Sequence, residues 1–450
     1  MDYEKFLMQK KKTHKNIGFE PYDVHPMLFE FQEELVKWAI RKGKSALWAG
    51  TGLGKTFMQV AWADQIVKYT EKPVLILAPL AVSSQTIEEA KKININISKI
   101  GGGDIQITNY EQIHNIDPTE YVGIVLDESG ILKNFAGKLK TKIIESFYNT
   151  PYKLCCSATP SPNDFTEIGN HAEFLNICSR TEMLSTYFVH DSKETQKWRL
   201  KGHAEEEFFT WLSTWAVMIS KPSDIGYKNG GFDLPPLNVY QHIVKAKSDD
   251  GDFFPTLAKT LNERRQARRD SLKERCKKAN SIMNGSDESW LYWCDLNIES
   301  QTLAGMVKNS IEITGSLKNE TKEERLLGFS SGKYKNIVVK PKIAQFGLNW
   351  QHCHNMVFVG LSDSFEAMYQ AIRRCWRFGQ KHPVDVHIVI SEKEGNVLLN
   401  IQRKEAQADK MLLQMVKCMS ELTKKEINNS SSETIEYKPI KKMECPSWGK

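Results

Sequence analysis

The sequence contains no apolar run long enough to cross a membrane. The longest stretches of this kind, such as Val74 to Val82, are nine residues, whereas a membrane-spanning helix needs roughly 20. The N-terminal segment leads into Lys10-Lys11-Lys12 with no apolar core behind it. We therefore expect neither secretion nor membrane insertion, and a cytoplasmic protein.

Paired cysteines are also missing. The nine cysteines are an odd number with no Cys-x-x-Cys pair, which excludes a disulfide framework and a zinc module. His352-Cys353-His354 is too compact for a metal site, because adjacent side chains point in different directions. With only 16 Pro and 27 Gly in 450 residues, the chain is neither collagen-like nor disordered. Its length predicts two or three domains.

The net charge of +6 is too small to indicate a partner by itself. Its distribution is uneven, because residues 263–279 hold eight basic and three acidic side chains. Two interpretations stay open for this predicted helix. It is either a solvated face with internal salt bridges, or a surface that follows phosphates, with Arg264 and Arg268 as candidate nucleic-acid contacts.

Short apolar runs alternate with helical stretches in both halves, which predicts an α/β fold with parallel sheets flanked by helices. The candidate strands are Ser45–Trp48, Val74–Leu77, Gly123–Leu126, Lys153–Cys156, Trp290–Cys294, Asn336–Val339, Met356–Val359 and Val384–Ile390. We expect an N-terminal extension (1–26), a first domain (27–225), a Gly/Pro-rich linker (226–237), a second domain (238–423) and a polar tail (424–450). The tail is predicted to be mobile or to dock a protein partner.

Residues 49–56, Ala-Gly-Thr-Gly-Leu-Gly-Lys-Thr, follow a candidate strand and open an apolar-periodic helix. This is the context of a phosphate-binding loop, in which glycines turn backbone N–H groups toward phosphate oxygens. Lys55 would reach the β- and γ-phosphates, and Thr56 would hold Mg²⁺ through its hydroxyl. The motif predicts ATP and Mg²⁺ as ligands, bound by the loop residues Gly50, Thr51, Gly52, Gly54, Lys55 and Thr56.

Asp127 and Glu128 close the strand 123–126, whose end should lie beside the loop in a parallel sheet. Asp127 can complete the Mg²⁺ shell through water, and Glu128 can accept a proton from the water that attacks the γ-phosphate. Ser157 and Thr159 follow the next strand, where their hydroxyls could couple the acidic pair to the neighbouring domain. By itself, the Asp-Glu pair could also cap a helix, and Ser157-Ala-Thr159 could be an ordinary turn.

The second half supplies Arg374 and Arg377, which would share one face of a helix, while Arg373 points elsewhere. Two guanidinium groups suit the charge of a γ-phosphoryl group in transit, as arginine fingers do. A basic surface helix is the alternative. The apolar residues between the arginines favour a segment packed against another element.

In this order, the motifs resemble those of a superfamily-two helicase, and more narrowly of the Swi/Snf-type branch of DNA translocases. Further similarity lies in Phe31-Gln32, residues 107–111, Ser157-Ala-Thr-Pro-Ser-Pro-Asn163, and residues 313–316, 324–325 and 347–350. Residues 221–227 and 230–236 are similar to compact phage and prophage motors, which would place the protein in a bacterial or phage-infected cytosol.

The resemblance implies two tandem RecA-like domains with an ATP cleft between them. It places Gln32 at the adenine and Gln370 at the nucleotide, and implies nucleic-acid contacts at Pro79, Thr108, Tyr110 and Asn349. The implied function is a DNA-dependent ATPase, acting as a monomer, that translocates on DNA and unwinds or remodels duplex or branched DNA in replication, recombination or repair. The alternatives are an RNA helicase, or the motor or scaffold subunit of a larger modification or nuclease complex.

The sequence departs from the family at Ser129-Gly130, where Ala-His or Gly-His is usual. Coupling between hydrolysis and the adjoining motif must then run through other groups. The chain is also too short for the large inserted lobes of chromatin remodellers, so no nucleosome role is implied. The segment 170–220, with Trp198, Trp211 and Trp215, is longer than a minimal motor needs, and we expect core packing there in preference to a substrate element.

Overall fold

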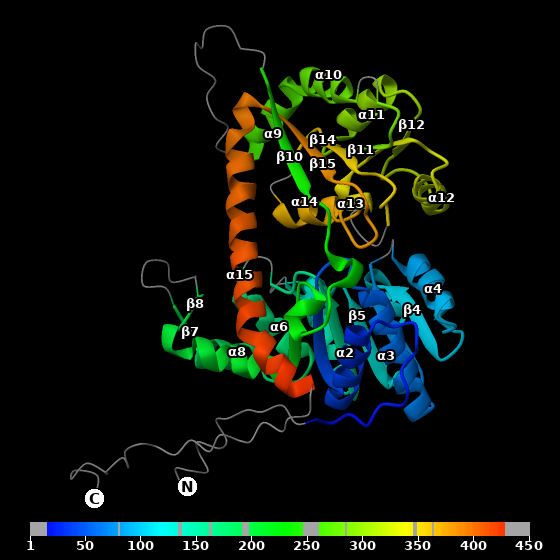
Figure 1. The fold of residues 1–450 in the computed structure, drawn as a ribbon, viewed down its shortest axis with the longest axis vertical. Coiled ribbons are helices and arrows are strands. Elements are labelled where there is room, and N and C mark those ends of the chain that lie inside the picture. Colours follow the sequence, from blue (N-terminus) through cyan, green and yellow to red (C-terminus); the bar gives the residue numbers. More distant parts are fainter. Residues whose placement is uncertain are drawn as a thin grey trace, which may run out of the picture.

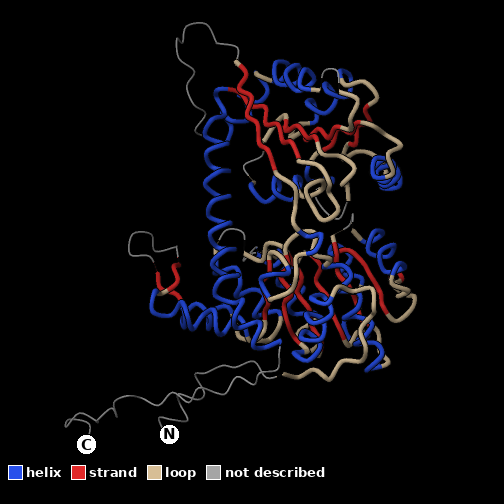
Figure 2. Tube along the Cα trace, in the orientation of Figure 1, coloured by secondary structure: helices blue, strands red, loops and turns tan. Residues whose placement is uncertain are grey.

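The computed structural model describes residues 16–79, 82–133, 137–161, 164–190, 198–245, 261–283, 286–344, 349–361 and 364–427. Two α/β domains lie one above the other, and a long C-terminal helix runs beside both (Figure 1). Each sheet passes through the middle of its domain with helices around it (Figure 2). None of the described helices has the length and apolar character needed to span a bilayer.

The first domain contains a seven-stranded parallel sheet in the order β3-β4-β2-β5-β6-β1-β9. Its strands are β1 (Lys44–Ala49), β2 (Val74–Ala78), β3 (Ser98–Lys99), β4 (Ile105–Asn109), β5 (Gly123–Asp127), β6 (Tyr152–Ser157) and β9 (Ala216–Ile219). The predicted strands of this half are confirmed, and β3, β4 and β9 are additional. All the central strands are buried on both faces, which accounts for their continuous apolar sequences.

Helices cover both faces of the first sheet. Residues of α2 (Glu30–Lys42), α3 (Lys55–Thr70) and α4 (Ser83–Lys92) belong to the apolar cluster on one face. The other face packs against helices α5 (Lys138–Ser146), α6 (Ile168–Phe174), α7 (Arg180–Tyr187) and α8 (Glu205–Ser213). In the segment 170–220, Trp211 and Trp215 are buried in this second cluster, so the predicted core packing is confirmed for them. Half-buried Trp198 stacks on His190 in the hairpin β7 (Phe188–His190)–β8 (Trp198–Leu200).

The second domain contains a six-stranded parallel sheet in the order β10-β15-β14-β11-β13-β12. Its strands are β10 (Leu237–Val244), β11 (Trp290–Trp293), β12 (Ser310–Ile313), β13 (Asn336–Val339), β14 (Asn355–Phe358) and β15 (Val384–Ser391). The four predicted strands are confirmed, and the edge strands β10 and β12 are additional. The helices are α9 (Leu261–Asp270), α10 (Leu272–Ile282), α11 (Asn297–Met306), α12 (Asn319–Ser330), α13 (Pro341–Ala344) and α14 (Phe365–Ile372).

The last described helix, α15 (Gly395–Ile427), belongs to both domains. It begins against the second domain, where Ile401 is buried in the core, and descends beside the first (Figure 1). There Met415 and Met419 are buried in the cluster that also contains α8. The first domain is therefore completed by a segment from within the predicted range 238–423 of the second. The predicted polar tail lies outside the described residues from 428 onward.

Candidate active site

The predicted phosphate loop, residues 49–56, joins β1 to α3. Gly52 and Gly54 have φ angles of +92° and +76°, a left-handed conformation that glycine adopts without a steric penalty. Gly54 is also the N-cap of α3, so the backbone N–H groups of the helix start face the loop. A Cβ at position 54 would collide with the side chain of Gln32. The loop is a backbone cradle closed on one side by this glutamine.

The polar groups of the loop fit a bound triphosphate with Mg²⁺. The Lys55 Nζ donates to the carbonyls of Ala49 and Gly50, at 2.8 and 3.3 Å. Burial lowers the pKa of Lys55, while Glu128 and Asp127 oppose this shift. The Thr51 hydroxyl is buried, with no hydrogen-bond partner among the described residues. Thr56 lies in the first turn of α3, where a hydroxyl can bind a phosphate-linked cation.

Gln32 is held by the loop and by its own helix. Its Nε2 donates to the Leu53 carbonyl at 2.9 Å, and its Oε1 accepts from the Phe29 N–H at 3.0 Å. Next to it, three phenylalanines from distant segments form a cluster. Phe378 contacts Phe232 and Phe29, with ring centroids 4.5 and 6.1 Å apart. An aromatic surface thus borders the predicted adenine position and joins the two domains.

Asp127 and Glu128 lie at the C-terminal end of β5. One strand, β6, lies between β5 and the loop strand β1 in the sheet. Asp127 Oδ1 accepts from the Gln59 Nε2 of α3 at 2.7 Å, which connects the acid to the loop helix. Burial raises the pKa of both carboxyls, and Lys55 lowers both. Asp127 raises the pKa of Glu128 further, as a like charge does.

Ser157 and Thr159 lie between the acidic pair and the second domain. The Ser157 Oγ accepts from the Thr159 N–H at 3.1 Å, which closes a local turn. A Cβ on Gly130 would lie 3.6 Å from the Thr159 carbonyl oxygen and 4.0 Å from Glu366 Oε1 of the second domain. The role of the two hydroxyl residues in coupling stays a prediction.

Arg374 and Arg377 face the phosphate loop from the second domain. Helix α14 ends at Ile372, so both arginines lie in the turns that follow and not on a helix as predicted. A Cβ on Gly52 would lie 2.8 Å from the Phe378 nitrogen and 3.7 Å from the Arg377 Cβ. Burial, followed by the charge of Arg377, lowers the pKa of Arg374, whereas Glu128 and Asp127 raise it. The acids of one domain and the arginines of the other therefore share one electrostatic site.

Two glutamines hold this arginine segment in place. The Arg374 Nε donates to the Gln370 carbonyl at 3.1 Å, and the Arg374 Nη2 donates to the Gln370 Oε1 at 3.5 Å. Gln380 donates to the carbonyls of Gln351, Cys353 and Cys375 at 3.0 to 3.2 Å. Arg373 points away, as predicted, and stacks over Tyr369 and Trp376.

Sequence reasoning missed four side chains that connect the site. Gln59 binds Asp127, as described above. Asn349 Nδ2 donates to Glu89 Oε1 of α4 across the cleft, at 3.2 Å. Lys133 and Glu366 form an ion pair that also crosses the cleft. No local spacing could have revealed these contacts, because the two cross-cleft pairs join residues 260 and 233 positions apart.

The predicted nucleic-acid contacts divide into two groups. Pro79 and Thr108 lie half-buried at the C-terminal ends of the adjacent strands β2 and β4, at one edge of the sheet. Tyr110 does not fit the prediction, because it is buried and its hydroxyl donates to the Asp127 carbonyl at 2.6 Å. Asn349 points into the cleft toward Glu89.

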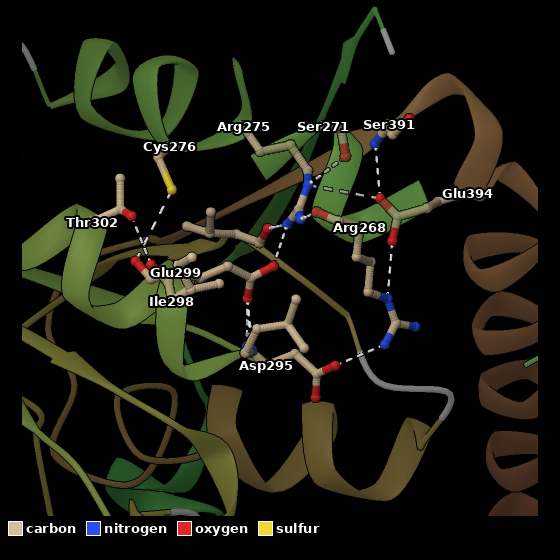
Figure 3. Close-up of polar contacts among 12 residues, drawn as sticks. Arg268, Ser271, Arg275, Cys276, Asp295, Ile298, Glu299, Thr302, Ser391 and Glu394 are labelled. Atoms are coloured by element: carbon tan, nitrogen blue, oxygen red, sulfur yellow. Dashed lines mark hydrogen bonds and ion pairs between the residues drawn. The ribbon is translucent and has the colours of Figure 1, made fainter. Parts of the chain in front are cut away.

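The predicted basic helix is two helices, α9 and α10, with Ser271 between them. The prediction for Arg268 is wrong, because its side chain is buried and pairs with Asp295 and Glu394 at 2.7 and 3.0 Å. Arg275 is also buried and pairs with Glu299 at 2.7 Å (Figure 3). Arg264 lies on α9, but its side chain is outside the described part. Two of the eight basic residues therefore form buried ion pairs close to the start of α15, while Arg269, Lys273, Lys277 and Lys278 are exposed.

Two domain families match the chain. Residues 55–183 match the SNF2-related domain, and residues 281–379 match the helicase conserved C-terminal domain. One match falls in each α/β domain, and together they indicate an ATP hydrolase whose domain pair is similar to that of superfamily-two Swi2/Snf2-type ATPases. Neither match supports the predicted similarity to compact phage and prophage motors.

One solved structure that matches is the SWI2/SNF2 ATPase core of Sulfolobus solfataricus in complex with dsDNA. It is 18% identical, with a TM-score of 0.42, and the match covers 91% of this chain and 98% of that chain. No curated protein matches the sequence.

Proposed function

We propose that the protein is a DNA-dependent ATPase that translocates along DNA and unwinds or remodels duplex or branched DNA in replication, recombination or repair. The observation that carries this proposal is the composition of the site. The phosphate loop and the acids come from the first domain and the arginines from the second, so hydrolysis requires a closed cleft. A site of this kind converts each ATP cycle into relative motion of the two domains.

Each group has a distinct task in the proposed reaction. The loop backbone and Lys55 hold the phosphates of ATP, and Thr56 with Asp127 would hold Mg²⁺, which neutralises charge on the β- and γ-phosphates. Glu128 accepts the proton of the attacking water. Arg374 and Arg377 stabilise the charge on the γ-phosphoryl group as it transfers.

DNA is the polymer that the SNF2-related match favours. The edge with Pro79 and Thr108 is the proposed contact surface of the first domain. Tyr110 follows β4 directly, and its hydroxyl donates to the backbone carbonyl of Asp127. This hydrogen bond connects the proposed DNA-contact edge to the acidic pair. Contacts through backbone phosphates would let the motor move with little regard to sequence.

The test is ATP hydrolysis by the wild type and Glu128→Gln without polymer, and with single-stranded DNA, duplex DNA, a branched junction or RNA. We expect duplex or junction DNA to stimulate the wild type and to leave the variant inactive. Stimulation by RNA alone would replace the DNA proposal with an RNA helicase. Hydrolysis that no polymer stimulates would contradict the motor proposal and favour a subunit of a larger complex.

A further inference from the structure

We propose that Glu89 is a positioning residue that holds Asn349 and Arg377 of the second domain against the first domain in the hydrolysis-competent state. The inference rests on ATP hydrolysis and not on which polymer stimulates it. Glu89 belongs to none of the motifs that carry the nucleotide chemistry. Its role follows from where its carboxylate lies.

Glu89 is unusually buried for a glutamate on a surface helix. It lies on α4, where its side chain is 8% exposed, whereas glutamates are almost never buried without partners. Its neighbour Glu88 shows the ordinary situation, since it is exposed and pairs with Lys91 on the same helix at 2.5 Å. The Oε1 of Glu89 accepts instead from the Gln85 Nε2 at 2.6 Å, which fixes the carboxylate toward the cleft.

The partners of this carboxylate beyond its own helix come from the second domain. Asn349 Nδ2 donates to Glu89 Oε1 at 3.2 Å. The Asn349 Oδ1 is buried with no partner among the described residues, so the bond to Glu89 is the contact that orients this amide. Because the two residues belong to different domains, their hydrogen bond exists only when the cleft is closed.

Glu89 also acts on the arginine that contacts the phosphate loop. Burial lowers the pKa of Arg377, and Glu89 is the strongest of the charges that raise it again. Arg373 has the opposite effect. The Arg377 guanidinium is therefore attracted toward Glu89, while the Arg377 Cβ lies beside Gly52 of the loop. A buried anion at this point aligns the guanidinium beside the phosphates before hydrolysis begins.

The variant Glu89→Gln separates charge from hydrogen bonding, because an amide oxygen still accepts from Asn349. We expect kcat for ATP to fall about tenfold with KM changed less than twofold, since an arginine finger acts mainly in the transition state. Glu88→Gln, one residue away and exposed, is the matched control and should keep the wild-type kcat. An equal loss in both variants would overturn the proposal.

A double-mutant cycle distinguishes positioning from a structural role. If Glu89 acts through Arg377, Glu89→Gln should cost nothing further in an Arg377→Ala background. Fully additive losses would show that Glu89 acts elsewhere and would overturn the proposal. Thermal unfolding of each full-length variant checks that the fold is retained.

A binding measurement tests the same idea without turnover. The affinity for ADP should stay within twofold in Glu89→Gln, whereas the affinity for ADP with aluminium fluoride, which mimics the transferring phosphoryl group, should fall about tenfold. Equal affinities for the aluminium fluoride complex in wild type and variant would overturn the proposal. A wild type that no DNA stimulates would contradict the proposed function and leave this comparison intact.

Discussion

At the scale of single residues, Glu128 combines backbone strain with a perturbed carboxyl. Its φ of +52° lies in the left-handed region, which a non-glycine residue adopts at a cost that surrounding structure must offset. Burial and the adjacent Asp127 raise its pKa above the ordinary 4.5. Such a group is poised to gain and lose a proton nearer neutral pH than a solvated glutamate.

The pH dependence of hydrolysis tests the role of Glu128. A general base must be ionised, so kcat should fall as the pH drops through its raised pKa, and the acid limb should lie above 4.5. Single-turnover rates from pH 5 to 8, with thermal unfolding as the control for acid denaturation, provide the measurement. An acid limb at the ordinary glutamate value would be inconsistent with a buried base.

Gln59 is a second residue with a specific expected effect. Its Nε2 bonds Asp127 Oδ1 at 2.7 Å and lowers the pKa of that carboxyl. Gln59→Ala should therefore weaken Mg²⁺ binding, raising the Mg²⁺ concentration for half-maximal hydrolysis about tenfold, as loss of a residue that orients a metal ligand does. Gln65→Ala on the same helix is the control, because Gln65 bonds the backbone of Tyr22 and Asp23, away from the acidic pair. Equal Mg²⁺ dependence in both variants would contradict the assignment.

At the scale of elements, the ion pair between Lys133 and Glu366 joins the 3-10 turn Ser129–Lys133 to α14. It lies beside Gly130, close to where the family usually places a histidine. We expect it to carry part of the coupling that this histidine would provide. Lys133→Glu or Glu366→Lys alone should slow hydrolysis about fivefold, the equivalent of roughly 1 kcal/mol for a partly exposed ion pair.

The charge-swapped double variant should recover most of that loss. The exposed pair Lys335–Asp287, which lies within the second domain, provides the matched control. Hydrolysis rates of these three variants and of the same charge reversals in the control pair, all measured at saturating ATP, are compared. If the swap fails to restore the rate, charge attraction across the cleft is not what the two residues contribute.

Helix α15 offers a prediction about stability. Met419 is fully buried in the first domain, while Leu413 on the same helix is 67% exposed. Met419→Ala should lower the free energy of unfolding by about 2–4 kcal/mol, and Leu413→Ala should change it by less than about 0.5. Chemical denaturation followed by tryptophan fluorescence, which reports on Trp211 and Trp215 nearby, makes the comparison. Similar values for the two variants would mean that α15 is not part of the first domain's core.

The elements and the site differed in how far the sequence could predict them. Buried strands such as Gly123–Asp127 were recognisable because both faces are covered, so the apolar run is continuous. The edge strand β10 was missed because none of its residues is fully buried, so it does not appear as a continuous apolar run. The phosphate loop, the acids and the arginines depend on local spacing, which a sequence displays.

The remaining site residues depend on partners that are distant in the chain. Gln59 binds Asp127 over 68 positions, and Arg268 pairs with Glu394 over 126. Counting charges could not show that Arg268 is buried, because its acidic partner lies in another segment. For the same reason, no local pattern indicated that Glu89 faces the cleft.

At the scale of the whole molecule, both halves of the candidate site come from one chain. The acids and the arginines are brought together by two cross-cleft contacts, by the phenylalanine cluster and by α15, which packs on both domains. A single copy therefore brings together all the residues proposed for hydrolysis, and the monomer expected from the sequence stays a prediction.

Mixing two inactive full-length variants tests this arrangement. Glu128→Gln lacks the base, and Arg374→Ala lacks an arginine from the opposite domain, so each should retain less than about 1% of the wild-type rate. Because every copy closes its own cleft, the mixture should hydrolyse ATP no faster than the two variants measured separately. Recovery of about a quarter of the wild-type rate in an equimolar mixture would instead mean that one copy's arginines reach another copy's acids, since random pairing would assemble intact sites at about that frequency.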